Sequence, residues 1–204
     1  MFKKTIEKIY LVLIVILLYA PIGTLVVLSF NNSRTAAKWG GFTLKWYSRL
    51  MENSQIISAF WTTIVLAVLS AVIATIIGTI AAIGMSNMKK RGRTLVLGMT
   101  NIPMLNADIV TGIALMLLFV RLSDFIEFGF VTVLISHITF NIPYVILNVL
   151  PKLKQINKHV YEAALDFGAT PLYAFFKVVL PDLLPGILTG FLLAFTMSLD
   201  DFVI

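Results

Sequence analysis

Three acidic residues lie in stretches of the sequence that are otherwise strongly apolar. Asp108 falls inside the apolar run 94–120, and Asp200 and Asp201 are adjacent in the run 183–204. An ionised carboxylate is costly in hydrocarbon, so it normally faces a partner, a cavity or a substrate. Two neighbouring carboxylates also repel each other unless a cation lies beside them. We therefore hypothesise that these three residues line a path for a cationic substrate.

This hypothesis has an alternative for each position. Asp108 could instead be a protonated or hydrogen-bonded acid that holds helices together. Asp200 and Asp201 could be solvated at the outer membrane surface. Four further polar residues in apolar runs are expected to make interhelical hydrogen bonds, with a contact to the substrate as the alternative. They are Asn101, Asn106, His137 and Asn141.

A segment polar enough to lie in water, residues 151–182, interrupts the apolar runs of the C-terminal half. Asn157 is a candidate N-cap for a short helix over 158–167. Gly168 follows at the position that favours a left-handed residue, where many helices end. The pattern predicts a short helix that stops at this glycine.

A second short helix is predicted after the glycine. Thr170 followed by Pro171 is typical of an N-cap and a first helical position, and Leu180-Pro181 is expected to end the helix. Its apolar side chains recur every three or four positions and would form a docking face. They are Leu172, Phe175, Phe176 and Val179. Spacing alone leaves open whether this helix pair contacts a protein, lies at the lipid interface or only connects spans.

The composition is that of an integral membrane protein. The 204 residues are 59% hydrophobic and only 13% charged, with a formal net charge of +6. The basic residues cluster between apolar runs, which favours a role in membrane orientation over nucleic-acid binding. The sequence has no cysteine and two histidines, so a disulfide framework, a thiolate metal site and a metal cluster are not expected. It also contains no recognisable phosphate-binding loop or nucleophile–base pattern, and we expect no catalysis by the chain itself.

Five apolar runs are predicted to cross the membrane as helices, giving an all-α polytopic bundle. They cover about residues 9–30, 56–85, 94–120, 129–150 and 183–204. The first run is interpreted as a span and not as a cleaved signal peptide, because it is long and lacks a small-x-small site. The last run stops without a polar tail, so we expect one further span beyond it.

The distribution of basic residues predicts the orientation of these spans. With five spans, the segments on the side of the N-terminus hold 11 Lys and Arg residues, and those on the other side hold 5. The positive-inside rule places the N-terminus and the segment 151–182 in the cytoplasm. Trp39, Trp46 and Tyr47 fall in the first external loop and are expected to be interfacial anchors.

The segment 162–181 resembles the EAA loop of ABC importer permeases. The residues that carry the resemblance are Glu162-Ala163-Ala164, Gly168 and Leu180-Pro181. Val178 stands where the family usually has isoleucine. Four other stretches are similar to the spermidine/putrescine branch of this family (PotC-like). They are Ser29 to Arg34, Gly41 to Tyr47, Ser136 to Phe140 and Ser198 to Asp201.

The resemblance implies a fold, partners and a location. The fold is that of type I ABC importer permeases (MetI-like), a single transmembrane permease domain over 1–204 that lacks its sixth span. The function is polyamine uptake across the bacterial cell membrane, driven by ATP that partner subunits hydrolyse. The implied partners are a second permease subunit, two ATP-binding subunits and an extracytoplasmic polyamine-binding protein, besides membrane lipid. No cofactor is implied, and Glu162, Ala163, Ala164, Gly168, Leu180 and Pro181 would couple the chain to the ATPase.

Two other functions remain open from the residues. The chain could be an ABC permease for another solute, although an anionic solute would be expected to meet basic residues in its path, and the intramembrane charges are acidic. It could also be an ATP-independent cation channel or carrier that uses Asp108 as a relay.

Overall fold

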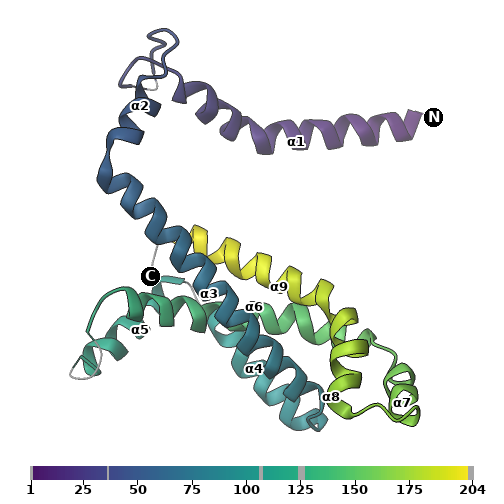
Figure 1. Cartoon of the computed structure of the whole chain (residues 1–204). Coiled ribbons are helices and arrows are strands. Elements are labelled where there is room, and N and C mark those ends of the chain that lie inside the picture. Colours follow the sequence, from purple (N-terminus) through teal and green to yellow (C-terminus); the bar gives the residue numbers. More distant parts are fainter. Residues whose placement is uncertain (1, 36, 106–107, 124–126, 202–204) are drawn as a thin grey trace. The chain divides into compact units, whose positions relative to one another are not determined.

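The computed structural model describes residues 2–35, 37–105, 108–123 and 127–201, and most of these residues are helical (Figure 1). The chain forms two compact units, Met1–Phe60 and Trp61–Ile204. The first unit contains α1 (Phe2–Ser29) and α2 (Lys45–Glu52). The second contains most of α3 (Ser54–Ser86) and all later helices.

Four helices of the described chain are long and apolar enough to cross a membrane. They are Glu7–Ser29 within α1, α3, α6 (Phe130–Gln155) and the continuous helix Pro171–Asp200. At a rise of about 1.5 Å per residue, each exceeds the roughly 30 Å of a hydrocarbon core. These helices coincide with the first, second, fourth and fifth predicted runs and confirm a polytopic helical membrane protein.

The third predicted run contains two described helices, α4 (Lys90–Leu105) and α5 (Asp108–Arg121). Residues 106–107 between them lie outside the described part of the chain. Asp108 is the first described residue of α5. The apolar part of α5, Ile109–Arg121, is shorter than the other spans.

The loop after α1 is folded around one buried asparagine. Asn31 is 2% exposed, and its side-chain oxygen accepts hydrogen bonds from the amides of Ser33 (3.1 Å) and Gly40 (2.7 Å). The Trp46 indole nitrogen donates to the Asn31 carbonyl oxygen at 2.7 Å. Asn31 also forms an isolated antiparallel bridge with Phe42. Trp46 was predicted to be an interfacial anchor, and no sequence pattern indicated that its indole ties α2 to the residues after α1.

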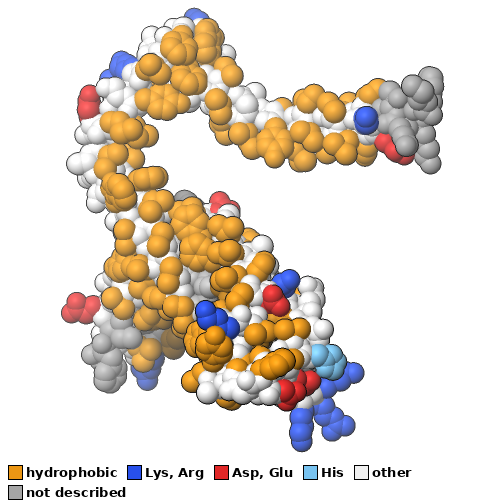
Figure 2. Space-filling model, turned by 45° about the vertical axis from the view of Figure 1, so that its right-hand side comes forward, with side chains coloured by type: hydrophobic (Ala, Val, Ile, Leu, Met, Phe, Trp, Pro, Cys, Tyr) orange, Lys and Arg blue, Asp and Glu red, His pale blue; other side chains and the backbone are white. Residues whose placement is uncertain are grey.

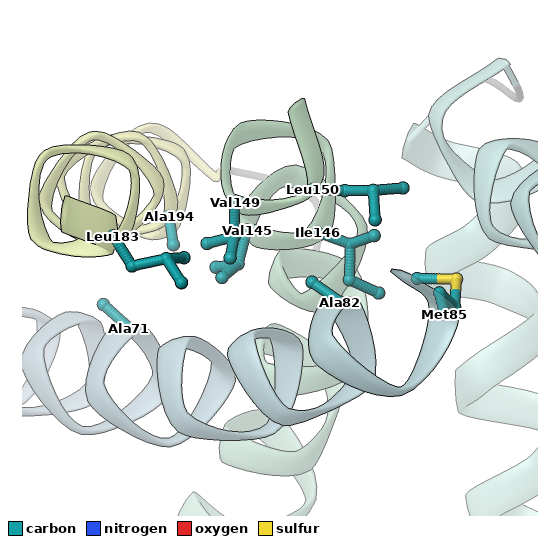
Figure 3. Close-up of a cluster of buried hydrophobic side chains, with 9 residues drawn as sticks. All are labelled: Ala71, Ala82, Met85, Val145, Ile146, Val149, Leu150, Leu183 and Ala194. Atoms are coloured by element: carbon teal, nitrogen blue, oxygen red, sulfur yellow. The ribbon is translucent and has the colours of Figure 1, made fainter. Parts of the chain in front are cut away.

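The core of the second unit lies where α3, α6 and α9 (Leu180–Asp200) meet, as Figure 3 shows. Small residues make the close packing possible. A Cβ on Gly78 of α3 would lie 2.8 Å from the side chain of Val145 of α6. A Cβ on Gly190 of α9 would lie 3.3 Å from the Cα of the same valine. Small interface residues let helix backbones approach closely in membranes, where van der Waals packing drives association.

The ends of these three helices have a defined arrangement. The C-terminal part of α3, the C-terminal part of α6 and the residues just before α9 line one shared pocket, through Ser86, Leu153 and Val179. Because α3 and α6 both end there and α9 begins there, the basic stretch 89–93 at the start of α4 and the segment 151–182 lie at the same end. Figure 2 shows that hydrophobic side chains cover most of the visible surface.

Candidate functional site

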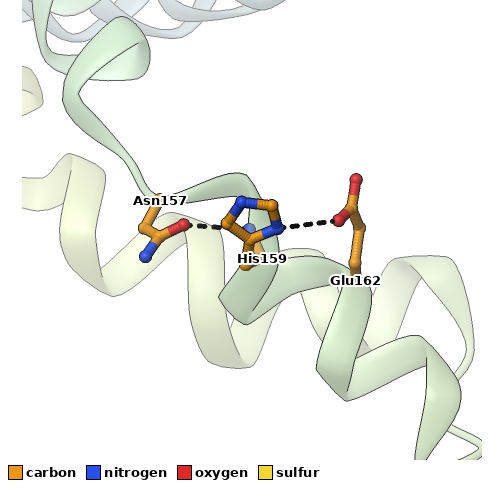
Figure 4. Close-up of polar contacts among 3 residues, drawn as sticks. All are labelled: Asn157, His159 and Glu162. Atoms are coloured by element: carbon orange, nitrogen blue, oxygen red, sulfur yellow. Dashed lines mark hydrogen bonds and ion pairs between the residues drawn. The ribbon is translucent and has the colours of Figure 1, made fainter.

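The segment that resembles an EAA loop forms two short helices with the predicted caps. The first is α7 (Lys158–Asp166), and the Asn157 side-chain oxygen accepts a hydrogen bond from the His159 amide at 3.0 Å (Figure 4). His159 Nδ1 lies 3.3 Å from Glu162 Oε2, a contact that Figure 4 marks with a dashed line. Both of these side chains are largely exposed, which limits what their contact contributes. The cap at Asn157 confirms the predicted start of the helix.

The glycine at the end of α7 has the predicted left-handed conformation. Gly168 has φ +87°, and its amide donates to the Leu165 carbonyl at 2.8 Å. The Ala169 amide donates to the Ala164 carbonyl at 3.1 Å. These two bonds form a Schellman motif, which satisfies carbonyls that a helix end otherwise leaves unpaired. A side chain at position 168 would meet no atom within 4 Å, so only the backbone conformation requires glycine there.

The second short helix begins as predicted but does not end as predicted. The Thr170 hydroxyl accepts from the Tyr173 amide, and α8 (Pro171–Ala174) follows. A π-helical turn, η1 (Phe175–Val179), then leads directly into α9. Leu180 and Pro181 are the first residues of α9, so the expected end at this pair is wrong. The Leu180 amide bonds five residues back to the Phe175 carbonyl, and the wider turn lets the helix continue into Pro181, which has no amide proton.

The π turn divides the predicted docking face. Leu172 lies before this turn and is 72% exposed, and Phe176 lies within it and is 58% exposed. Leu183, beyond the turn, is fully buried. Val179 packs against the core of the second unit. In an uninterrupted α-helix, positions 172, 176, 179 and 183 would share one side. The exposed face is therefore smaller than predicted, and Phe167, 93% exposed, extends it at the tip of the helix pair.

The predicted coupling residues lie at two depths. In and after α7, Glu162, Ala163 and Gly168 are exposed and Ala164 is half-buried. At the start of α9, Leu180 is half-buried and Pro181 is exposed. Glu162 also borders an open pocket of about 400 Å³. The other residues of this pocket include Ile83 and Asn87 from the end of α3, Ile156 after α6, and Tyr161 and Phe175 from the helix pair. One side of the helix pair thus borders the ends of α3 and α6. Its tip at Phe167 is exposed.

A buried polar cluster lies in the first part of α6 and near the end of α9, against the middle of α3. The hydroxyls of Ser70 on α3 and Ser198 on α9 share a hydrogen bond of 2.9 Å. His137 Nδ1 on α6 lies 2.7 Å from the Ser198 hydroxyl. All three side chains are at most 5% exposed. The cluster joins α3, α6 and α9, and confirms the interhelical hydrogen bond expected for His137.

The acidic residues of the predicted path have different positions. Asp200 ends α9 and is exposed, and Asp201 directly follows it and is half-buried. The Asp201 carboxylate lies within electrostatic range of His137, next to the buried cluster. Asp108 begins α5, and its side chain lies outside the described residues. The structure thus brings Asp201 to the cluster and leaves the position of the Asp108 side chain undescribed.

The interhelical hydrogen bond predicted for Asn141 is not formed within the described part of the chain. Asn141 is 1% exposed, and neither its side-chain oxygen nor its nitrogen has a hydrogen-bond partner within the described part of the chain. The Asn101 side-chain oxygen is also unpaired there, and Asn106 lies outside the described residues. The sequence interpretation missed Ser70 and Ser198. The four-residue spacing of Gly186, Gly190, Ala194 and Ser198 is the signal that could have identified a packed face on α9.

Comparison with known proteins identifies the family. Residues 74–204 match the family described as "Binding-protein-dependent transport system inner membrane component". The match includes the helix pair α7–α8, all of α6 and all of α9. It does not include the first unit or Ser70.

Individual relatives extend the similarity over nearly the whole chain. The chain is 42% identical over 187 residues to the spermidine/putrescine transport system permease protein PotC of Escherichia coli K12, covering 92% of this chain and 70% of that protein. It is 39% identical over 192 residues to the putrescine transport system permease protein PotI of the same strain, covering 92% and 68%. A PotC homolog of Mycoplasma genitalium is 31% identical over 217 residues, covering 100% and 75%. The chain therefore belongs to the family of inner membrane components of binding-protein-dependent transport systems.

Proposed function

We propose that this chain is a membrane-spanning permease subunit of an ATP-driven ABC importer that takes up polyamines. The observation that carries the proposal is 42% identity over 92% of the chain to a protein named as a spermidine/putrescine transport permease. The putrescine permease PotI supports the same substrate class. The acidic residues at the end of α9 are consistent with a cationic substrate.

The helix pair α7–α8 is the proposed contact with the ATPase subunits. It is rigidly capped at Asn157 and Gly168, and it exposes Phe167, Leu172 and Phe176 at its tip. An exposed apolar patch on a rigid element is typical of a protein interface. Glu162, Ala163, Ala164, Gly168, Leu180 and Pro181 are the proposed coupling residues, with Leu180 and Pro181 acting from inside the continuous helix.

The shared end of α3, α6 and α9 supports a cytoplasmic location for the helix pair. Eight Lys and Arg residues belong to the two connections at this end, residues 89–93 and 151–182. Cytoplasmic loops of membrane proteins carry such an excess of basic residues. With this orientation the N-terminus is cytoplasmic, and the Ser70–His137–Ser198 cluster lies toward the outer side of the bacterial cell membrane.

In this proposal the substrate passes close to the acidic residues Asp108, Asp200 and Asp201. Carboxylates can replace water around the ammonium groups of a polyamine, and acids at separate depths suit a chain with separated charges. The chain is a single permease domain whose partners are a second permease subunit, two ATP-binding subunits and an extracytoplasmic polyamine-binding protein. ATP is hydrolysed by the partners, and this chain changes conformation in response.

Affinity purification from native membranes tests the assembly. The tagged chain is expected to copurify with an ATPase, a second permease and a binding protein, and the ligand of that binding protein identifies the solute. Reconstituted complexes are then expected to take up labelled spermidine or putrescine only with ATP. ATP-independent uptake by the purified chain in liposomes would contradict the proposal.

The substrate path is tested by Asp108→Asn. The control is Asp182→Asn, because Asp182 is an exposed acid in the first turn of α9, at the opposite end of that helix from Asp200. Uptake is expected to fall at least tenfold for Asp108→Asn and to stay unchanged for the control. Assembly and ATPase activity are measured for both variants. Unchanged uptake by Asp108→Asn would remove this residue from the path.

A further inference from the structure

The first unit contains a pocket that includes none of the residues proposed for the substrate path or for coupling. It is open, has a volume of about 660 Å³ and lies between the end of α1, the loop after it and α2. This volume is within the roughly 300–1,000 Å³ that is usual for ligand sites. The lining residues are Leu28, Ser29, Asn31, Ser33, Arg34, Thr35, Trp46, Tyr47, Arg49 and Leu50.

The polar part of this pocket is suited to an anion. Arg34 and Arg49 both line it, and none of its other lining residues is charged. Ser33 and Thr35 add hydroxyl groups, which share a hydrogen bond of 3.3 Å. Guanidinium groups with hydroxyl donors are a common combination for binding phosphate oxygens. The two arginines are not paired with an acid through any salt bridge of the described residues.

The walls of the pocket are held in place by the folded loop. Asn31 is buried and fixes the loop through Ser33 and Gly40, and the Trp46 indole fixes α2 to the Asn31 carbonyl. The Ser29 and Tyr47 hydroxyls share a hydrogen bond of 2.8 Å across the same junction. The Arg49 guanidinium lies 5.6 Å from the centre of the Trp46 ring, which orients it by a cation–π contact. The site is therefore preformed.

The location of the pocket favours a lipid over a water-soluble anion. Leu28 and Ser29 belong to the last residues of the candidate span Glu7–Ser29, so the pocket lies at a boundary of the hydrocarbon. Leu28 and Leu50 give it an apolar part beside the arginines. Trp46 and Tyr47 belong to the residue types that gather at the headgroup level. A cationic site next to an apolar one at this depth matches a phospholipid headgroup with the start of its acyl chains.

We propose that this pocket binds the headgroup phosphate of an anionic phospholipid, with Arg34 and Arg49 as its ligands. The lipid would fill the space between the end of α1 and α2 and hold the two helices together. The site is distinct from the polar cluster and from the α7–α8 helix pair, since it lies entirely within residues 28–50.

Native mass spectrometry of the purified full-length complex tests the proposal. The complex is exposed to equimolar phosphatidylglycerol and phosphatidylcholine with identical acyl chains, and retained lipid is counted. We expect the unchanged protein to retain phosphatidylglycerol preferentially. Arg34→Gln with Arg49→Gln is expected to lower that retention about tenfold. The matched control, Lys38→Gln with Lys45→Gln, removes two charges from the same loop and helix outside the pocket and should leave retention unchanged.

Three results would overturn the proposal. Equal retention of both lipids by the unchanged protein would show that the pocket does not select a charged headgroup, and this arm needs no variant. Displacement of the lipid by millimolar inorganic phosphate would indicate a site for a free anion. Unchanged lipid retention by the arginine variant, together with loss of the copurified binding protein, would assign the pocket to an acidic protein surface. The thermal unfolding midpoint of each variant confirms that it is folded.

Discussion

The two ends of the α3–α6–α9 bundle distribute polar and apolar groups in opposite ways. At one end Ser70, His137 and Ser198 are buried and bond to one another across three helices. At the other end Phe167 and Leu172 are exposed on a helix pair that is capped at Asn157 and Gly168. Hydrogen bonds satisfied within the chain stabilise the fold. The first end is thus held by contacts within the chain, whereas the second exposes the apolar side chains that we propose as the contact with the ATPase.

The largest expected effect comes from the middle of the bundle, which connects the two ends. Gly78→Val would place side-chain atoms into Val145 of α6, where even a Cβ lies at 2.8 Å. Overpacking of this kind costs about 1–3 kcal/mol or more, and both ends should be lost together. The thermal unfolding midpoint and the yield of monodisperse protein measure this. Gly84→Val is the control, since a Cβ there meets nothing within 4 Å; an equal loss for both variants would refute the packing argument.

Gly168→Val should damage only the end with the helix pair. A non-glycine residue in the left-handed region costs about 1–2 kcal/mol, and a β-branched residue is among the least tolerant. We expect normal insertion, an unchanged unfolding midpoint of the bundle and reduced copurification of the ATPase. Gly168→Asn should have a smaller effect, because asparagine adopts this conformation more readily. Normal copurification and normal uptake by the valine variant would show that the helix pair does not depend on its Schellman motif.

Ser198→Ala should damage only the end with the polar cluster. The change removes the bonds to both Ser70 and His137, and interhelical hydrogen bonds in membranes contribute about 0.6 kcal/mol each on average. We expect a small decrease in the unfolding midpoint with unchanged ATPase copurification. Ser86→Ala is the control, since the Ser86 hydroxyl donates to the Ile83 carbonyl of its own helix and makes no bond to another helix among the described residues. A double-mutant cycle with Ser70→Ala that shows no coupling would mean that the cluster does not link α3 to α9.

The smallest effect is expected for His159→Gln on α7. The His159–Glu162 contact is 3.3 Å long, but the two side chains are 88% and 63% exposed. Exposed pairs of this kind often contribute nothing measurable. The unfolding midpoint and ATPase copurification should both stay unchanged. A clear loss of copurification would indicate that a partner, and not the chain, uses this pair.

The sequence was informative where structure depends on neighbouring residues. Asn157, Gly168 and Thr170 cap helices through bonds that span at most five residues, so their types and spacing predict the outcome. The apolar runs likewise predict four of the spans, because length and composition alone determine whether a helix can cross a membrane.

The sequence was less informative where structure depends on distant residues or on unusual backbone. Ser70 and Ser198 are 128 positions apart, and nothing local identifies them as partners. Pro181 is typical of a helix end, yet the π turn before it lets the helix continue. The role of Asn31 depends on a loop that closes over nine residues.

The π turn also makes the chain tolerant of a one-residue deletion at one place. This turn holds one residue more than an α-turn does, so a deletion within Phe175–Val179 can be absorbed by closing an ordinary α-turn. Both kinds of turn make about one full rotation, so the residues before the deletion would keep nearly the same orientation relative to α9. The same deletion within α9 has no extra residue to remove, and it would rotate everything before it by about 100°. The turn is therefore the place in the helix Pro171–Asp200 where the length can change by one residue while Leu172 keeps its direction.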